Sequence, residues 1–285
     1  MTTLAGKRAL VTGGAAGIGQ LLGAELAERG AQVVLWDIDK ARLDSAVEEI
    51  SKASGGSCSG FVCDVADPQA VRTAADAVLS EVGDIDVLVN NAGIVTGAPL
   101  LELADEAIES TFRVNVLPLY WVTKAFLPGM IVRERGHVVT IASAAGLLGV
   151  ARQTDYSASK HAAIGFDESL RVELARVAPA IRTTVVCPFY IDTGMFAGVR
   201  TRFRRILPIL RAEDVARRVA SAVEKDRRSL IMPGIVRLVP VLRALPVPVF
   251  DRLMNLFGVN VSMDEFVGHA GAGRPLQGSE GGSRL

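Results

Sequence analysis

A glycine-rich turn between a strand-like run and a helical pattern constrains this chain more than any other feature. Residues 12–19 read TGGAAGIG, with an apolar run before them and apolar residues at helical spacing after them. Glycines in such a turn let the backbone approach a phosphate, and free N–H groups at the helix start point toward it. The string alone also fits an ordinary turn. In this context it predicts a dinucleotide loop, with contacts from Gly13, Gly17, Ile18 and Gly19.

Short β-branched runs alternate with longer helical patterns along most of the chain. The runs are residues 9–11, 32–36, 60–63, 87–89, 138–141, 183–187 and 230–232. Segments between them, such as 18–29 and 40–52, place apolar residues on one helical face and charges on the other. Strands joined through helices pair in parallel. The sequence therefore predicts an α/β, doubly wound Rossmann fold with a seven-stranded parallel sheet and helices on both faces.

Composition excludes several classes of protein. The formal net charge is zero, so nothing indicates a nucleic-acid partner. Three cysteines without CxxC spacing indicate reduced residues in a cytosolic protein, and we expect no metal site. The N-terminus lacks the pattern of a secretory signal. Residues 230–250, the most apolar segment, contain Arg237, Arg243 and four prolines, so we expect no transmembrane span.

Asp37 follows the second predicted strand at the spacing of a residue that binds the adenosine ribose. A carboxylate there repels the 2′-phosphate of NADP. The glycine loop contains no Arg or Lys, and Lys40 is the nearest basic residue after Asp37. The cofactor prediction is therefore NAD, with NADP disfavoured. Asp37 also fits the N-cap of the next helix, although Asp39 fits that role at least as well.

Two more strands end in polar residues at the edge where ligands of open α/β sheets bind. Asp64 and Val65 end the third strand, and the sequence NNAG at residues 90–93 ends the fourth. The second group also fits a plain turn, because Asn and Gly tolerate left-handed backbone. We expect further cofactor contacts from Asp64, Val65, Asn91, Ala92 and Gly93.

A Ser, Tyr and Lys set follows the fifth predicted strand. Ser143 lies at the strand end, and Tyr156 and Lys160 stand four residues apart at the start of a helix, on one face. At ~5 Å and an effective dielectric of ~20, the Lys160 cation would favour phenolate by about 3 kcal/mol and lower the pKa of Tyr156 by roughly two units. Such a phenol can transfer protons near neutrality. Alone, the pair also fits a surface Tyr beside a solvated Lys.

Residues 7–232 resemble the short-chain dehydrogenase/reductase family. The loop at 12–19 matches its TGxxxGxG motif, residues 90–93 its NNAG motif, Ser143 its catalytic serine and residues 156–160 its YxxxK motif. The resemblance implies catalytic roles for Asn115, Ser143, Tyr156 and Lys160. It implies that Asn115 holds a helix bend and a water that links Lys160 to solvent. It also implies cofactor contacts from Tyr156, Lys160, Pro188, Ile191 and Thr193. Phe189 replaces the glycine of the family's Pro-Gly pair.

Three runs, at residues 36–38, 187–196 and 262–266, are similar to a narrower branch. It holds the type-10 and epidermal retinol dehydrogenases and the type-11 and type-13 17β-hydroxysteroid dehydrogenases. The resemblance, together with the NAD prediction from Asp37, implies NAD-dependent interconversion of a lipophilic alcohol and its carbonyl. Family habit implies a homodimer or homotetramer. Animal members carry an N-terminal hydrophobic anchor, which this chain lacks, so we expect a cytoplasmic protein, soluble or peripherally membrane-associated.

The substrate is expected beneath a lid at about residues 194–212. Seven apolar side chains favour a retinoid, steroid or long-chain alcohol, although they also fit packing on the core or on a partner subunit: Met195, Phe196, Phe203, Ile206, Leu207, Ile209 and Leu210. Arginines at 200, 202, 204 and 205 fit a solvated face or an anionic membrane. We expect one domain over residues 1–268, including a Leu/Pro-rich extension at 233–268, and a disordered tail at 269–285.

Two other functions fit the sequence less well. The first is an NADPH-dependent carbonyl or 3-oxoacyl reductase, which Asp37 disfavours. The second is a catalytically silent, nucleotide-binding regulatory protein, which the intact Ser143, Tyr156 and Lys160 disfavour.

Overall fold

A computed structural model describes residues 2–56 and 58–268, and the predicted tail at 269–285 lies outside this part of the chain. Its centre is a seven-stranded parallel sheet in the order β3-β2-β1-β4-β5-β6-β7. The strands are β1 (Arg8–Thr12), β2 (Gln32–Asp37), β3 (Cys58–Val62), β4 (Val87–Asn90), β5 (Gly136–Ile141), β6 (Ile181–Pro188) and β7 (Ser229–Met232). The fold prediction is confirmed.

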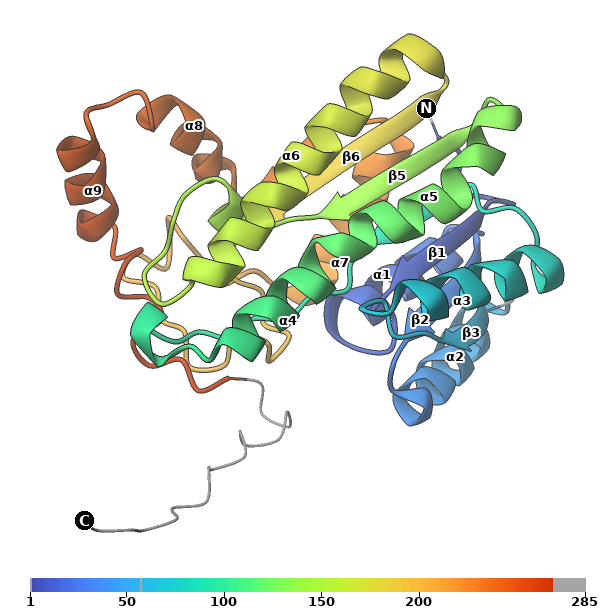
Figure 1. Ribbon diagram of the computed structural model, residues 1–285, viewed down its shortest axis with the longest axis horizontal. Helices are drawn as coiled ribbons and strands as arrows, with labels where there is room; N and C mark the ends of the chain where they lie inside the picture. Colours follow the sequence, from blue (N-terminus) through green and yellow to red (C-terminus); the bar gives the residue numbers. More distant parts are fainter. Residues whose placement is uncertain (1, 57, 269–285) are drawn as a thin grey trace, which may run out of the picture.

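Helices cover both faces of the sheet (Figure 1). The main helices are α1 (Gly17–Glu28), α2 (Lys40–Ser54), α3 (Pro68–Glu81), α4 (Asp105–Asn115), α5 (Leu117–Val132), α6 (Thr154–Val177) and α7 (Ala212–Glu224), with short 3₁₀ turns η1 (Leu100–Glu102) and η2 (Ala144–Gly146). One core cluster joins α1, α2 and α7 to one face. A second joins α3, α5 and α6 to the other.

Alternation along β2 shows how one strand supplies both cores. Val33 and Leu35 pack in the first cluster, whereas Val34 and Trp36 pack in the second. All four side chains are fully buried. A strand buried on both faces needs a continuous apolar run, which is what the sequence provides.

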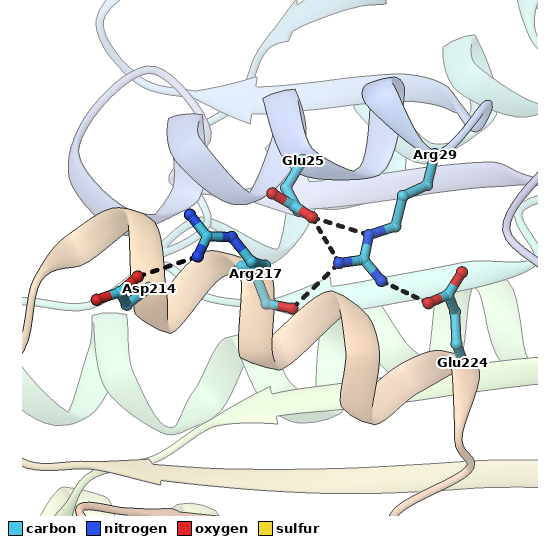
Figure 2. A network of polar contacts seen from close by, with 5 residues as sticks. All are labelled: Glu25, Arg29, Asp214, Arg217 and Glu224. Carbon is cyan, nitrogen blue, oxygen red and sulfur yellow. Dashed lines mark hydrogen bonds and ion pairs between the residues drawn. The ribbon is translucent and has the colours of Figure 1, made fainter.

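Arg29, just after α1, ties α1 to α7 (Figure 2). Its guanidinium binds the carboxylates of Glu25 and Glu224, and it donates to the backbone carbonyl of Arg217 at 3.3 Å. Arg217 in turn pairs with Asp214 at 3.2 Å. The two helices are thereby held together at their solvent-facing side, above the apolar contacts of the first core cluster.

The order of the strands places a ligand crevice at the carboxyl ends of β1 and β4. The chain winds outward from β1 to β3 and then, beginning at β4, in the opposite direction to β7. Loops that leave neighbouring strands toward opposite faces separate at such a reversal. The TGGAAGIG loop follows β1, and the NNAG turn overlaps the end of β4, so both predicted motifs lie at this crevice.

Beyond β7 the chain builds a small helical cap of η3 (Gly234–Leu238), α8 (Val239–Leu242) and α9 (Val247–Leu256). Figure 1 shows α8 and α9 projecting from the sheet layers on the side of the β5 and β6 carboxyl ends. Within residues 2–56 and 58–268, no helix combines the length and apolar character needed to cross a membrane.

Candidate active site

The side chain of Thr12 joins the two cofactor motifs. Its hydroxyl accepts hydrogen bonds from the backbone N–H groups of Asn91 (2.9 Å) and Ala92 (3.1 Å) and donates to the carbonyl of Val89 at 3.4 Å. In return, the Asn91 amide donates to the carbonyls of Thr12 (2.8 Å) and Gly13 (3.1 Å). The glycine loop and the NNAG turn therefore form one hydrogen-bonded edge of the crevice.

The geometry of this edge fits a dinucleotide. A Cβ on Gly19 would lie 2.0 Å from the carbonyl oxygen of Gly13, and Gly17 has a positive φ of 55°. Ala16, the N-cap of α1, has no polar side chain, and within residues 2–56 and 58–268 it provides no side-chain cap for the first N–H groups of the helix. The Asn91 Oδ1 atom is buried and has no partner among the described residues. Backbone close enough to touch a pyrophosphate, beside uncapped N–H groups, forms an anion cradle.

A groove along this edge collects most of the predicted cofactor contacts. They are Gly13, Gly17, Ile18, Gly19, Asp37, Asn91, Ala92, Gly93, Tyr156, Lys160, Pro188, Ile191 and Thr193. Asp64 and Val65 do not line it. β3 ends at Val62, before this pair; the Asp64 carboxylate accepts a hydrogen bond from the Ala66 N–H at 2.9 Å, and Val65 packs in the second core cluster.

Asp37 and Asp39 divide the two roles that the sequence left open. The Asp37 carboxylate accepts hydrogen bonds from the N–H groups of Ala15 (3.0 Å) and Asp39 (3.1 Å), which fix it beside the glycine loop. Asp39 caps α2 by accepting from the Arg42 N–H at 3.1 Å. Arg42 also lines the groove, a feature that sequence reasoning missed because it lies one helical turn beyond Asp39. Its guanidinium lies 3.3 Å from the Asp39 carboxylate.

The four residues expected to perform chemistry are buried. Ser143 follows β5 and caps η2, and its hydroxyl forms a hydrogen bond with the phenol of Tyr156. Tyr156 and Lys160 occupy successive turns at the start of α6. Tyr156 and Ser143 thus present two hydroxyl groups at one point.

The expected lowering of the Tyr156 pKa is wrong for this geometry, because burial acts in the opposite direction. The Lys160 ammonium donates to the carbonyl of Ile141 at 2.9 Å and lies 5.7 Å from the centroid of the Tyr156 ring. Burial raises the pKa of Tyr156, and the hydrogen bond from Ser143 offsets this only in part. Burial likewise lowers the pKa of Lys160 to about 8. Loss of hydration therefore outweighs the attraction that sequence spacing suggested.

Asn115 lies at the break between α4 and α5, as the predicted helix bend requires. Its Oδ1 accepts from the Ile94 N–H at 2.8 Å, and its Nδ2 donates to the Ile94 carbonyl at 2.9 Å and to the Ser159 hydroxyl at 3.0 Å. A Cβ on Gly93 would lie 3.3 Å from the Asn115 Oδ1 and 3.5 Å from the Lys160 Nζ. A side chain at position 93 would therefore crowd the Asn115 and Lys160 side chains, and glycine keeps this space free.

An apolar cavity adjoins the groove at the chemical residues. Both cavities are lined by Ser143, Tyr156, Phe189 and Phe196. The remaining wall is mostly apolar and includes Leu148, Val150, Leu207, Val236, Val239, Leu242, Met254, Phe257 and Val259. Phe189, where the family has glycine, therefore lies where the two cavities meet. The helical cap supplies much of the wall, so residues after β7 complete the site.

The apolar side chains of the predicted lid divide between two roles. Phe196, Ile206 and Leu207 line the apolar cavity, and Met195 lines the groove. Phe203 packs on Phe257 of the cap, with ring centroids 6.1 Å apart. Ile209 packs against the small cluster of Tyr190, Val199 and Met263, and Leu210 packs on the first core cluster. The sequence left ligand contact and core packing as alternatives for these residues. In the structure, some of them line the cavities and the others pack on the protein.

Sequence reasoning missed two polar features of the apolar cavity. Gln153 is buried beside Tyr156, its amide nitrogen lies 3.1 Å from the sulfur of Met263, and its Oε1 has no partner in the described part of the chain. The hydroxyl of Tyr190 lies 2.8 Å from that of Ser262. The only sequence signal for Gln153 was its place three residues before Tyr156. The run at residues 262–266 was the signal for the contact between Ser262 and Tyr190, but the run does not reveal which residue Ser262 contacts.

The sequence is similar to a known protein family and to named members of it. The family described as short chain dehydrogenase matches residues 7–203. Epidermal retinol dehydrogenase 2 of Mus musculus is 40% identical over 267 residues, which cover 93% of this chain and 86% of the mouse protein. Retinol dehydrogenase 10-B of Danio rerio is 37% identical over 285 residues, which cover 92% of this chain and 85% of the fish protein.

Solved structures share the fold. A short-chain dehydrogenase/reductase from Burkholderia phymatum in complex with NAD superposes with a TM-score of 0.77 at 28% identity, over 86% of this chain and 95% of that one. Actinorhodin polyketide ketoreductase with NADPH gives a TM-score of 0.75 at 32% identity, over 83% of this chain and 99% of that one. The two neighbours hold different nicotinamide cofactors in similar folds.

Proposed function

This chain belongs to the short-chain dehydrogenase family and is an NAD(P)-dependent oxidoreductase acting on CH–OH groups, and we propose that it uses NAD to interconvert a lipophilic alcohol and its carbonyl. The alcohol is a retinoid, a steroid or a long-chain alcohol. The observation that carries this proposal is the junction at Ser143 and Tyr156, where a groove fitting a dinucleotide meets an apolar cavity.

In the proposed mechanism the chain's own residues orient the substrate and move one proton. Ser143 hydrogen-bonds the substrate oxygen, and ionised Tyr156 removes the alcohol proton. A bound NAD⁺ would supply the hydride acceptor for the carbinol carbon, and its positive charge would favour the phenolate. Lys160 would hold the nicotinamide ribose and stabilise the phenolate, and Asn115 supports the proton path from Lys160 to solvent. The reverse reaction uses the same groups, with Tyr156 donating the proton.

Because Tyr156 is buried, its ionisation in this scheme requires positive charge nearby. Burial raises the pKa of Tyr156, so the phenol is protonated near neutral pH unless a further positive charge is supplied. The pKa of Lys160, lowered to about 8, still leaves most of its amine charged at pH 7. Ionisation of Tyr156 therefore relies on the oxidised cofactor and Lys160 together.

The preference for NAD rests on Asp37. Its carboxylate is fixed by the backbone of the glycine loop, where it suits two ribose hydroxyls and opposes a 2′-phosphate. Arg42 acts in the other direction, because a guanidinium on the wall of the same groove suits a phosphate. Asp39 already pairs with that guanidinium, which supports NAD as the better cofactor.

The test is a set of initial rates with NAD⁺ and NADP⁺ against retinol, hydroxysteroids and straight-chain alcohols. The expected result is turnover with NAD⁺ on one lipophilic class. Preference for NADP(H), with turnover of small ketones, would instead assign the carbonyl or 3-oxoacyl reductase that Arg42 favours. Tight NADH binding without turnover on the panel would leave the regulatory, catalytically silent alternative.

We also propose a cytoplasmic homodimer or homotetramer. Free cysteines at 58, 63 and 187 suit a reducing compartment. Exposed Leu117 and Tyr120 on α5 and Val172 on α6 offer apolar area for a second copy. Light scattering on the purified protein measures the oligomeric state, and a monomer at all concentrations would contradict the proposal.

A further inference from the structure

The apolar cavity lies beneath an exposed apolar surface of the helical cap. Ile206, Ile235 and Leu238 line the cavity and are also exposed to solvent. In α8 and at the start of α9, the side chains of Val241 and Val247 are 71% and 70% exposed. The other large exposed apolar residues of the cap are Leu245, Val249 and Leu256. We call this set, with the three rim residues, the cap surface. Apolar exposure gathered on one small helical element is typical of an interaction site.

The cap surface belongs to a strongly basic part of the chain. The two segments that build it, residues 194–211 and 233–256, contain eight arginines and a single acidic residue, Asp251, in a chain whose formal net charge is zero. Arg204, Arg205, Arg237 and Arg252 make no ion pair or hydrogen bond with the described residues. Four guanidinium groups without a partner in the described part of the chain, in the same segments as exposed apolar side chains, indicate a partner that presents anionic groups above an apolar layer.

We propose that the cap surface docks on an anionic phospholipid bilayer and that the substrate reaches the cavity from that bilayer between Ile206 and Leu238. This inference rests on the proposed lipophilic substrate. Val241 and Val247 enter the acyl boundary, and the unpaired arginines bind lipid phosphates. The cap stays outside the acyl core as a peripheral element, consistent with short helices that also contribute Val239 and Met254 to the cavity wall.

A bilayer explains the pattern better than a second copy of the chain. A self-complementary interface would bring the same arginines of two copies together, and the two segments supply only Asp251 to offset them. Anionic headgroups neutralise them directly. An opening formed by exposed apolar side chains also gives a lipophilic alcohol a path that avoids water.

Vesicle co-sedimentation of the full chain tests docking independently of activity. Phosphatidylcholine vesicles with and without phosphatidylserine are compared for wild type, the double variant Val241→Glu/Val247→Glu and the control Val132→Glu. Val132 is 84% exposed at the end of α5, away from the cap (Figure 1). We expect binding to the anionic vesicles that weakens with salt, a loss of at least about tenfold in the double variant, and no change in the control.

Kinetics test the route of the substrate. With a water-soluble alcohol, the double variant should match wild type, because neither valine lines the cavity. With the alcohol embedded in anionic vesicles, the KM of the double variant should be higher than that of wild type, and kcat should be unchanged. Equal KM values in vesicles would overturn the bilayer route.

Other outcomes separate this inference from the proposed function. Wild type that ignores both vesicles, or a double variant that still binds them, would overturn docking. A dimer that the double variant disrupts, without vesicle binding, would assign the cap surface to a second copy. Salt-sensitive vesicle binding lost in the double variant, together with no turnover of any alcohol, would support docking and contradict the proposed function alone.

Discussion

The Lys160 ammonium lies 5.7 Å from the centroid of the Tyr156 ring, yet its hydrogen bond goes to the backbone of Ile141. Burial raises the pKa of Tyr156 and lowers that of Lys160, so it shifts both groups toward their neutral forms, although most of the Lys160 amine is still charged at pH 7. The base form of Tyr156 therefore becomes more populated as pH rises. We expect the rate of alcohol oxidation at saturating NAD⁺ to increase from neutral to alkaline pH, and the rate of carbonyl reduction to fall. A flat profile for both directions, without a change in the limiting step, would contradict proton transfer by Tyr156.

Removing the Tyr156 hydroxyl should abolish turnover without loss of cofactor binding. Proton transfer by a positioned group contributes about 10²–10⁴ to the rate, so Tyr156→Phe should lower kcat by at least that factor. Tyr190→Phe is the matched control, since Tyr190 is also buried and close to Phe196 but bonds Ser262 instead. Its kcat should stay within a few-fold of wild type, with a stability loss of about 1 kcal/mol. Equal losses of kcat in both variants would contradict the assignment.

Replacing Asp37 should change the cofactor that is used. Asp37→Ala removes the carboxylate and leaves Arg42 on the groove wall, so kcat/KM with NADP⁺ should rise relative to NAD⁺ by about tenfold or more, equivalent to about 1.4 kcal/mol. Asp39→Ala removes a helix cap instead and should cost about 1 kcal/mol of stability. Its NAD⁺ preference should weaken less than that of Asp37→Ala. The reverse order of effects would exclude Asp37 as the selective residue.

A methyl group at Gly19 should prevent cofactor binding. It would lie 2.0 Å from the Gly13 carbonyl oxygen, and the loop must move to accept it. We expect Gly19→Ala to weaken NADH binding, measured by calorimetry, by at least about tenfold. Gly165→Ala is the control, because a Cβ there meets nothing within 4 Å. Located inside α6, it should raise stability by about 0.5–1 kcal/mol and leave NADH affinity unchanged. Unaltered affinity in Gly19→Ala would refute the cradle.

His137 should make folding sensitive to mild acid. Burial lowers the pKa of His137 to about 4, so the imidazole is neutral in the fold, whereas the unfolded chain takes up a proton below about 6.5. Its contribution is therefore complete above pH 6.5 and is lost as pH falls to 4, by about 3 kcal/mol in all.

His137→Gln keeps polar atoms beside Thr184 but does not titrate in this range. Urea unfolding between pH 7 and 4.5 should therefore show a smaller loss for the variant than for wild type. Comparing the two proteins cancels the opposite contribution of Asp167, whose carboxyl pKa burial raises to about 6. Parallel losses in both proteins would rule out His137 as the source.

Sequence periodicity predicted the sheet because each strand is a short apolar run and each crossover a helical pattern. All seven predicted runs overlap a strand, and the glycine loop and NNAG turn meet at one crevice. The resemblance to retinol dehydrogenases is confirmed. The features that the sequence did not predict depend on how residues are placed in three dimensions. Arg42 reaches the groove only through the direction of α2, and the pKa of Tyr156 follows from burial, which the spacing to Lys160 does not reveal.

The helical cap was beyond sequence reasoning for the same reason. Its arginines and prolines argued against a membrane span, and its apolar residues carried no regular period. Tyr190 and Ser262, whose hydroxyls meet, are 72 residues apart in the chain. Long-range contacts of this kind fix a segment without leaving a local pattern.

The split of the site between two parts of the chain has a consequence for how such enzymes diversify. The groove and the proton-transfer residues are complete by residue 196, whereas the wall of the apolar cavity continues to Val259. Changes in the final quarter of the chain can therefore reshape substrate range while the hydride chemistry is conserved. New specificity can evolve at the end of the gene with little risk to the reaction itself.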